Sequence, residues 1–196
     1  LTKKLRKTSH IVGYDGSKVV ITNDLIINIL TSTMQASVSK KKKIAVSKVE
    51  RIRVEPIPFT ERFTFGDFAY MITQSDYDDA CFIYNDNMWC FRNENALYPG
   101  GGNACIRPWR NVRSMPIPTG DMGGFRSLDE VVDGGMTVKE AIDKAMENLR
   151  TFFEENTSKK RIIYSCTSTD DKTIGQGIFT IAREVREYIT NSLLNF

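Results

Sequence analysis

One stretch of this chain combines residue types that could bind a phosphate group. It runs from a β-prone segment at residues 80–84 into a polar triplet at residues 85–87, and later into three consecutive glycines at residues 100–102. Adjacent glycines lose more backbone entropy on folding than other residues, so they indicate a close approach of the backbone to another group. Glycine-rich backbone between a strand end and a helix start presents free N–H groups and the helix dipole, which suit a phosphate. A glycine-rich turn without a ligand explains the same pattern, and both interpretations stay open.

Two later segments repeat this arrangement of a strand followed by glycine. A short predicted strand at residues 114–118 leads into Thr119 and Gly120, and another at residues 161–165 is followed by a loop with Gly175 and Gly177. Ligands of open α/β sheets bind beyond the carboxyl ends of the strands. We therefore expect the three glycine-rich loops to line one crevice.

The elements that must position these loops alternate along the chain. The pattern predicts strands over residues 68–73, 80–84, 114–118 and 161–165, and helices over residues 137–153 and 179–191. Ser127 and Glu130 also form a capping-box pattern that predicts a further helix start. Alternating strands and helices indicate an α/β fold, with a mixed, mostly parallel central sheet between two helical layers.

The N-terminal part of the chain differs in charge from the rest. Residues 1–56 hold 12 Lys and Arg against 4 Asp and Glu, whereas residues 57–196 hold 15 against 20. We therefore predict a basic extension over residues 1–56, with a helix at residues 24–35 and strands within residues 44–57, followed by an α/β domain over residues 57–196. The extension contains four consecutive lysines, which are Lys40, Lys41, Lys42 and Lys43.

This lysine run is a candidate contact for nucleic acid, because such binding depends on neutralising phosphates. A solvated loop is the favoured explanation of such a run, since no aromatic residue lies within it to stack on a base. A non-catalytic module that binds nucleic acid or a nucleotide signal is therefore the alternative function.

The residue inventory argues against several kinds of site. The only histidine, His10, lies in the basic extension, so a Ser-His-Asp or Cys-His centre in the main domain is not expected. The P-loop and dinucleotide-binding glycine patterns are absent. Four cysteines without C-x-x-C spacing predict reduced thiols rather than a zinc site, so we expect neither metal nor cofactor.

Overall composition fits a globular protein that is not embedded in a membrane. Apolar residues make up 41% of the chain and charged residues 26%, and no apolar run is long enough to span a bilayer. With reduced cysteines, this predicts an intracellular, cytoplasmic protein without membrane contact.

The groups left for a site are backbone donors and a few polar side chains. The amides of Asn85 and Asn87 suit sugar hydroxyls, Arg107 suits bidentate pairing with a phosphate, and Trp109 and Phe179 suit stacking on a base. Each also has a local explanation, in which the amides cap turns, the arginine forms an ion pair and the aromatic rings are core. Both interpretations stay open for each residue.

Three motifs in this order resemble the macro domain, an α/β fold that binds ADP-ribose. They are Tyr-Asn-Asp-Asn at residues 84–87, Gly-Gly-Gly-Asn-Ala-Cys-Ile at residues 100–106, and Gly-Gln-Gly-Ile-Phe at residues 175–179. The resemblance covers roughly residues 66–194. It implies a protein that binds ADP-ribose or a related nucleotide diphosphate, and possible hydrolysis of an ADP-ribose ester, phosphate or ADP-ribosyl linkage.

The resemblance also implies roles for particular residues. It places catalysis at Asn85, Asp86 and Asn87, with Asp86 as the general base. It places nucleotide and phosphate binding at Gly100, Gly101, Gly102, Asn103, Arg107, Thr119, Gly120, Gly175, Gly177, Ile178 and Phe179.

One departure from the family pattern bears on catalysis. Some hydrolytic macro domains carry an Asp just after the glycines, where this chain has Ala104 or Cys105. The motifs are also similar to a group of phage and bacterial proteins without an assigned activity, which implies host cytoplasm as the location if the chain is encoded by a phage.

Overall fold

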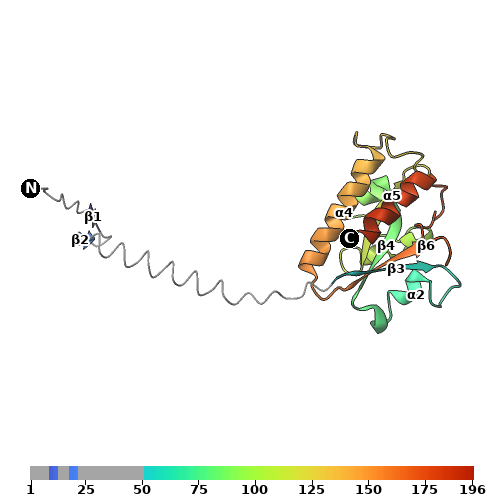
Figure 1. Cartoon of the computed structure of the whole chain (residues 1–196), viewed down its shortest axis with the longest axis horizontal. Coiled ribbons are helices and arrows are strands. Elements are labelled where there is room, and N and C mark those ends of the chain that lie inside the picture. The colour runs from blue at the N-terminus through green and yellow to red at the C-terminus, as the bar shows by residue number, and fades with distance from the viewer. Residues whose placement is uncertain (1–8, 13–17, 22–50) are drawn as a thin grey trace, which may run out of the picture. The chain divides into compact units, whose positions relative to one another are not determined.

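The computed structural model describes residues 9–12, 18–21 and 51–196 (Figure 1). The chain divides into two compact units, residues 1–49 and residues 50–196. In the first unit, β1 (Ser9–Val12) pairs antiparallel with β2 (Lys18–Ile21). The helix predicted at residues 24–35 and the four lysines Lys40 to Lys43 lie outside the described residues.

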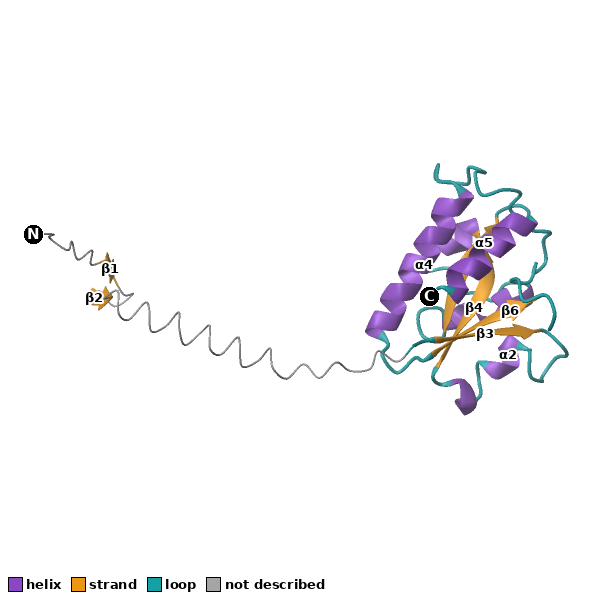
Figure 2. Ribbon diagram, in the orientation of Figure 1, coloured by secondary structure: helices purple, strands orange, loops and turns teal. Residues whose placement is uncertain are grey.

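A four-stranded parallel sheet organises the second unit, in the order β3-β6-β4-β5 (Figure 2). Its strands are β3 (Arg53–Pro58), β4 (Ala80–Asn87), β5 (Ser114–Gly120) and β6 (Arg161–Cys166). Because the strands are parallel, all of their carboxyl ends lie at one edge of the sheet. With its helices, this sheet confirms the predicted α/β class.

Helical segments connect the strands of this sheet. They are α2 (Phe68–Met71), the 3₁₀ helix η1 (Ser75–Tyr77), α3 (Met88–Arg92), the 3₁₀ helix η2 (Gly102–Trp109), α4 (Val138–Glu155) and α5 (Arg183–Leu194). In the part of the chain that the structure describes, none of the helices has the length and apolarity needed to span a membrane.

Both faces of the sheet carry buried apolar side chains. On β4, Cys81 and Ile83 belong to the cluster that includes the apolar faces of α4 and α5. The alternate residues Phe82 and Tyr84 belong to a second cluster with residues of α2 and η2. Burial on both faces explains why β4 reads in the sequence as an unbroken apolar run.

Strand β3 places the start of the α/β unit earlier than the sequence indicated. Residues 50–56 were assigned to the basic extension, but Arg53 lies opposite Arg161 in the sheet, and the compact unit begins at Glu50.

The two prolines of β3, Pro56 and Pro58, fit because β3 is an edge strand. On its open side no neighbouring strand needs a backbone N–H from β3.

The strand predicted over residues 68–73 is wrong, since this segment forms the helix α2. The Asp67 side chain accepts a hydrogen bond from the Ala69 N–H and caps the helix. Phe68, Met71 and Ile72 then recur at helical spacing and are buried together against η2 residues. The cap and this spacing outweigh the β propensity of the aromatic residues.

Two predicted helix starts also differ from the structure. No helix follows Ser127. A capping box would need the Glu130 carboxylate to accept from the N–H of Ser127, but it accepts from the N–H of Arg126. The last helix begins at Arg183 rather than at residue 179, since the Ala182 N–H donates to the Phe125 carbonyl (2.9 Å) and ties the preceding segment to the loop after β5. The third glycine loop therefore does not adjoin a helix N-terminus.

The capping box of α4 gives a test of how this helix is fixed. The Thr137 side chain accepts from the Glu140 N–H (3.2 Å), and the Glu140 carboxylate accepts from the Thr137 N–H (2.7 Å). Thr137→Ala removes one of these bonds, so we expect the free energy of unfolding in urea to fall by about 1 kcal/mol. Thr137→Ser keeps the hydroxyl and should be close to wild type; an equal loss in both variants would contradict this account.

Candidate functional site

Two adjoining cavities lie at the carboxyl edge of the parallel sheet. The larger has a volume of about 670 Å³ and the smaller about 150 Å³. Gly100, Asn103 and Gly177 line both, so the two spaces share a wall. We call the smaller one the loop cavity, because the glycine-rich loops border it, and the larger one the aromatic cavity, after the phenylalanines that border it.

The structure brings the predicted site residues together at these cavities. The loop cavity is lined by the polar triplet and by residues from all three glycine-rich loops, as the sequence predicted. Gly102 and Gly175 line the aromatic cavity instead, and Trp109 lines neither. The predicted site residues that line the loop cavity are Asn85, Asp86, Asn87, Gly100, Gly101, Asn103, Arg107, Thr119, Gly120, Gly177, Ile178 and Phe179.

Asn85 links two of the loops through hydrogen bonds. Its side-chain amide donates to the Gly175 carbonyl (2.8 Å), and its side-chain oxygen accepts from the Asn103 amide (3.0 Å). The Asn103 side-chain oxygen in turn accepts from the Asn85 N–H (3.0 Å). These bonds engage both ends of the Asn85 amide, which makes this residue a positioning group between the loops.

Asp86 forms a buried ion pair with Arg107. The guanidinium donates from Nη2 to Oδ1 (2.6 Å) and from Nε to Oδ2 (3.2 Å), and its Nη1 donates to the Tyr98 carbonyl (2.8 Å). The two side chains are 0% and 3% exposed. The Tyr98 ring also lies 5.3 Å from the guanidinium carbon, in cation–π contact.

This ion pair changes the roles that the resemblance implied for both residues. Burial raises the pKa of the Asp86 carboxyl, and the hydrogen bonds from Arg107 oppose that rise. Both carboxylate oxygens are occupied, because Oδ1 also accepts from the Asn87 N–H (2.9 Å). Asp86 therefore has the contacts of a structural anion rather than of a general base, and Arg107 uses both ends of its guanidinium within the protein.

Asn87 ends β4 and begins the next helix. Its side-chain oxygen accepts from the Cys90 N–H (2.7 Å) and caps α3. The register of β4 against β5 shifts between Asp86 and Asn87, so that Asn87 lies opposite Gly120. Such irregularities at a strand end change the direction of the chain near a site.

The loop at residues 175–179 presents backbone donors at the cavity. In the part of the chain that is described, the N–H groups of Gln176, Gly177 and Ile178 have no hydrogen-bond acceptor, and all three residues are exposed. Gly177 has a φ of +69°, in the left-handed region where a side chain is strained. Successive free N–H groups around such a residue form a concave site that attracts anions.

The glycines at residues 100–102 face this loop across the cavity. A Cβ at Gly101 would lie 3.4 Å from Ile178 Cδ1, so the two loops meet at that side chain. The first hydrogen bond of η2 joins the Ala104 N–H to the Gly101 carbonyl (3.2 Å), which leaves the N–H groups of residues 102 and 103 without an intrahelical partner. Both loops therefore border the cavities and carry main-chain N–H groups without an acceptor within the described residues.

Gly120 and Gly124 have a different reason to be glycine. A Cβ at Gly120 would lie 2.1 Å from the Gly123 carbonyl oxygen, and one at Gly124 would lie 2.0 Å from that of Thr180. These positions admit no side chain because backbone packs against backbone there. The Thr119 hydroxyl donates to the Asp86 carbonyl (3.4 Å), so this loop also supports the ion-paired strand.

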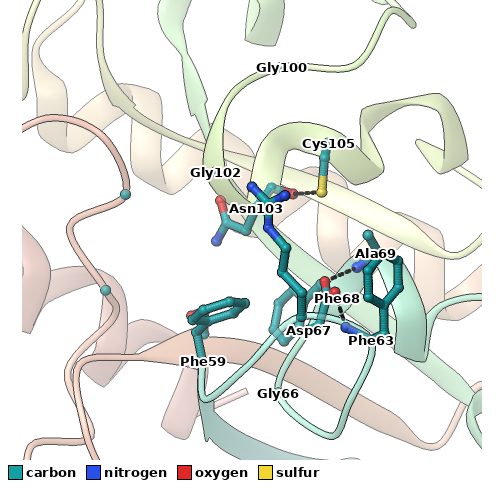
Figure 3. Close-up of a pocket in the computed structure, with 14 residues that line it drawn as sticks. Phe59, Phe63, Gly66, Asp67, Phe68, Ala69, Gly100, Gly102, Asn103 and Cys105 are labelled. Carbon is teal, nitrogen blue, oxygen red and sulfur yellow. Dashed lines mark hydrogen bonds between the residues drawn. The ribbon is translucent and has the colours of Figure 1, made fainter.

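The aromatic cavity was not predicted from the sequence. Phe59 and Phe63, which are 58% and 79% exposed, line it from the loop that follows β3. The Asp67 carboxylate holds this loop by accepting from the N–H groups of Phe63 (2.9 Å) and Ala69 (3.0 Å) (Figure 3). The missed signal was the position of residues 59–67 after a parallel strand, which brings them to the same edge as the glycine loops.

Cys105 is a candidate nucleophile that lines the aromatic cavity. Burial raises the pKa of its thiol above the ordinary value. The reactive form of cysteine is the thiolate, so this environment disfavours nucleophilic chemistry.

The buried ion pair can be tested by removing one charge and then both. Asp86→Asn leaves the Arg107 guanidinium buried without a counter-charge, so we expect the free energy of unfolding to fall by about 3–5 kcal/mol. The double variant Asp86→Leu with Arg107→Met removes both charges and should recover most of the loss. Chemical denaturation gives the free energy of unfolding of the wild type, the single variant and the double variant. A single variant as stable as the wild type would rule out the structural role of the ion pair.

No family model, curated protein or solved structure matches the chain. The resemblance to macro domains therefore stays a prediction from three short motifs. Any function assigned to the two cavities is carried by their own geometry and chemistry.

Proposed function

We propose that this protein binds ADP-ribose or a related nucleotide diphosphate in the two adjoining cavities. The observation that carries the proposal is the row of unpaired N–H groups at residues 176–178, which faces the glycines of residues 100–102 across the loop cavity. A diphosphate has negative oxygens on both sides, and donors from two loops can bind them together.

The aromatic cavity suits the nucleoside part of such a ligand. Its volume of about 670 Å³ falls within the roughly 300–1,000 Å³ of typical small-molecule sites. Phe59 and Phe63 offer ring faces for stacking on a base. The shared wall at Asn103 and Gly177 would let one ligand extend from the phosphate donors to the aromatic rings.

Binding without hydrolysis is the activity that these residues support best. Among the described residues that line the loop cavity, Asp86 is the only carboxylate, and it is held in the ion pair with Arg107. The aromatic cavity adds Asp67, whose carboxylate accepts two backbone N–H groups. Neither carboxylate is free to activate a water, so we propose that the protein retains its ligand rather than cleaving it.

The finer description of the fold belongs to the same proposal. The sheet buries apolar residues on both faces, against α4 and α5 on one and against α2 and η2 on the other. This supports a three-layer α/β/α arrangement of macro-domain type, in which the strand-end loops form the ligand site. In this proposal, the ligand at the strand-end loops is a nucleotide derivative of the cytoplasm.

Isothermal titration calorimetry with ADP-ribose tests the proposal directly. The wild-type protein should bind it, and Gly177→Ala should weaken binding at least about tenfold, because a side chain at a φ of +69° shifts the N–H groups of the loop. Gly135→Ala is the matched control, since Gly135 has a φ of +78°, has no neighbour within 4 Å of its missing Cβ, and lines neither cavity. It imposes similar backbone strain and should bind like wild type. Absence of heat with folded wild-type protein at millimolar ADP-ribose would refute the proposal.

A further inference from the structure

A second aromatic surface continues from the aromatic cavity. It is a groove of about 460 Å³ between the loop after β3 and α2, which we call the outer groove. Its residues are Phe63, Thr64, Phe65, Tyr70, Gln74, Ser75, Asp76 and Tyr77. Phe63 lines both this groove and the aromatic cavity, so the two spaces adjoin at this residue.

The aromatic side chains here are exposed although the loop that carries them is held in place. Phe63 is 79%, Phe65 58% and Tyr70 39% exposed. The Thr60 hydroxyl donates to the Phe65 carbonyl (2.6 Å), and the Asp67 carboxylate accepts from the Phe63 N–H. Phe63 also has a φ of +62°, a conformation that costs free energy for a bulky residue. A fixed loop that exposes apolar rings at a conformational cost indicates a binding surface.

We propose that the outer groove binds a second nucleobase, so that the two cavities and the groove together also accept the end of a single-stranded oligonucleotide with a terminal phosphate. This inference rests on the proposed function, because it places the terminal phosphate at the glycine loops and the first base in the aromatic cavity. The second base then stacks in the outer groove on the far side of Phe63. Aromatic rings bind successive bases in this way in proteins that bind single strands.

Charged and polar groups on both sides of Phe63 fit such a ligand. Arg62 lines the aromatic cavity next to Phe63, and within the described residues it forms no ion pair, so it can pair with the linking phosphate. In the outer groove, the Asp76 carboxylate can accept from the exocyclic amino group of adenine or cytosine. A single nucleotide has no linking phosphate for Arg62 and no second base for Asp76.

The test compares adenosine 5′-monophosphate with 5′-phosphorylated diadenylate by calorimetry. The wild-type protein should bind the dinucleotide about tenfold more tightly, because the second base adds a stacking contact. Phe65→Ala combined with Tyr70→Ala removes rings from the outer groove only, and the ratio of the two affinities should fall to about one. Phe59→Ala, in the aromatic cavity, should weaken both ligands and leave the ratio near its wild-type value.

Trp89→Ala controls for the loss of an exposed aromatic residue, since Trp89 is 53% exposed on α3 and lines neither cavity nor the outer groove. Its affinity ratio should equal that of wild type. Equal wild-type affinities for the two ligands, or a ratio unchanged by the double variant, would overturn the second-base site even where ADP-ribose binds. Conversely, a ratio that depends on Phe65 and Tyr70 in a protein that does not bind ADP-ribose supports the second-base site and refutes the proposed diphosphate ligand.

Discussion

The candidate site depends on the buried ion pair between Asp86 and Arg107. Two fully buried charges persist only when nearly every polar atom has a partner, and here the carboxylate oxygens, the guanidinium and the Tyr98 carbonyl are joined in one network. The pair connects the end of β4 to η2. It also explains one of the three glycines, because a Cβ at Gly100 would lie 2.7 Å from Arg107 Nη2. Part of the glycine signal in the sequence therefore comes from packing onto an arginine rather than from a ligand.

The polar side chains at the strand end build the cavity, while the backbone supplies its binding groups. Asn85 joins the loops at Asn103 and Gly175, and Asn87 caps α3. With Asn85 and Arg107 engaged inside the protein, the donors left at the loop cavity among the described residues are main-chain N–H groups and the side-chain amides of Asn87 and Gln176. Main-chain donors have fixed directions set by the surrounding fold, so they bind an oxyanion without the entropy loss of ordering long side chains. The contacts of Asn87 and Arg107 agree with the local interpretation, in which the amide caps a turn and the arginine forms an ion pair.

The sequence predicted the elements whose signals are long or repeated. The apolar runs of β4 and β6 and the helical periodicity of α4 extend over many residues, and the glycine loops follow strands, so their convergence could be deduced from parallel topology alone. It could not predict α2, which has four residues and depends on the cap at Asp67. It also could not pair Asp86 with Arg107, because the two lie 21 residues apart and no local pattern joins them. The start of α5 was missed since a backbone bond to Phe125 fixes the segment before it.

Under the proposed function, backbone donors alone do not distinguish one phosphate compound from another, because N–H groups bind any oxyanion of suitable size. We propose that selectivity comes from the loop at residues 59–67, which carries the exposed rings. Holding Phe63 at a φ of +62° costs on the order of 1–3 kcal/mol, and the two N–H bonds to Asp67 offset that cost in the free protein. The ring is thus placed before any ligand arrives, so that a ligand which stacks on it gains contact without the cost of ordering the loop. A phosphate compound without a base meets the same N–H groups but gains nothing from this preset ring.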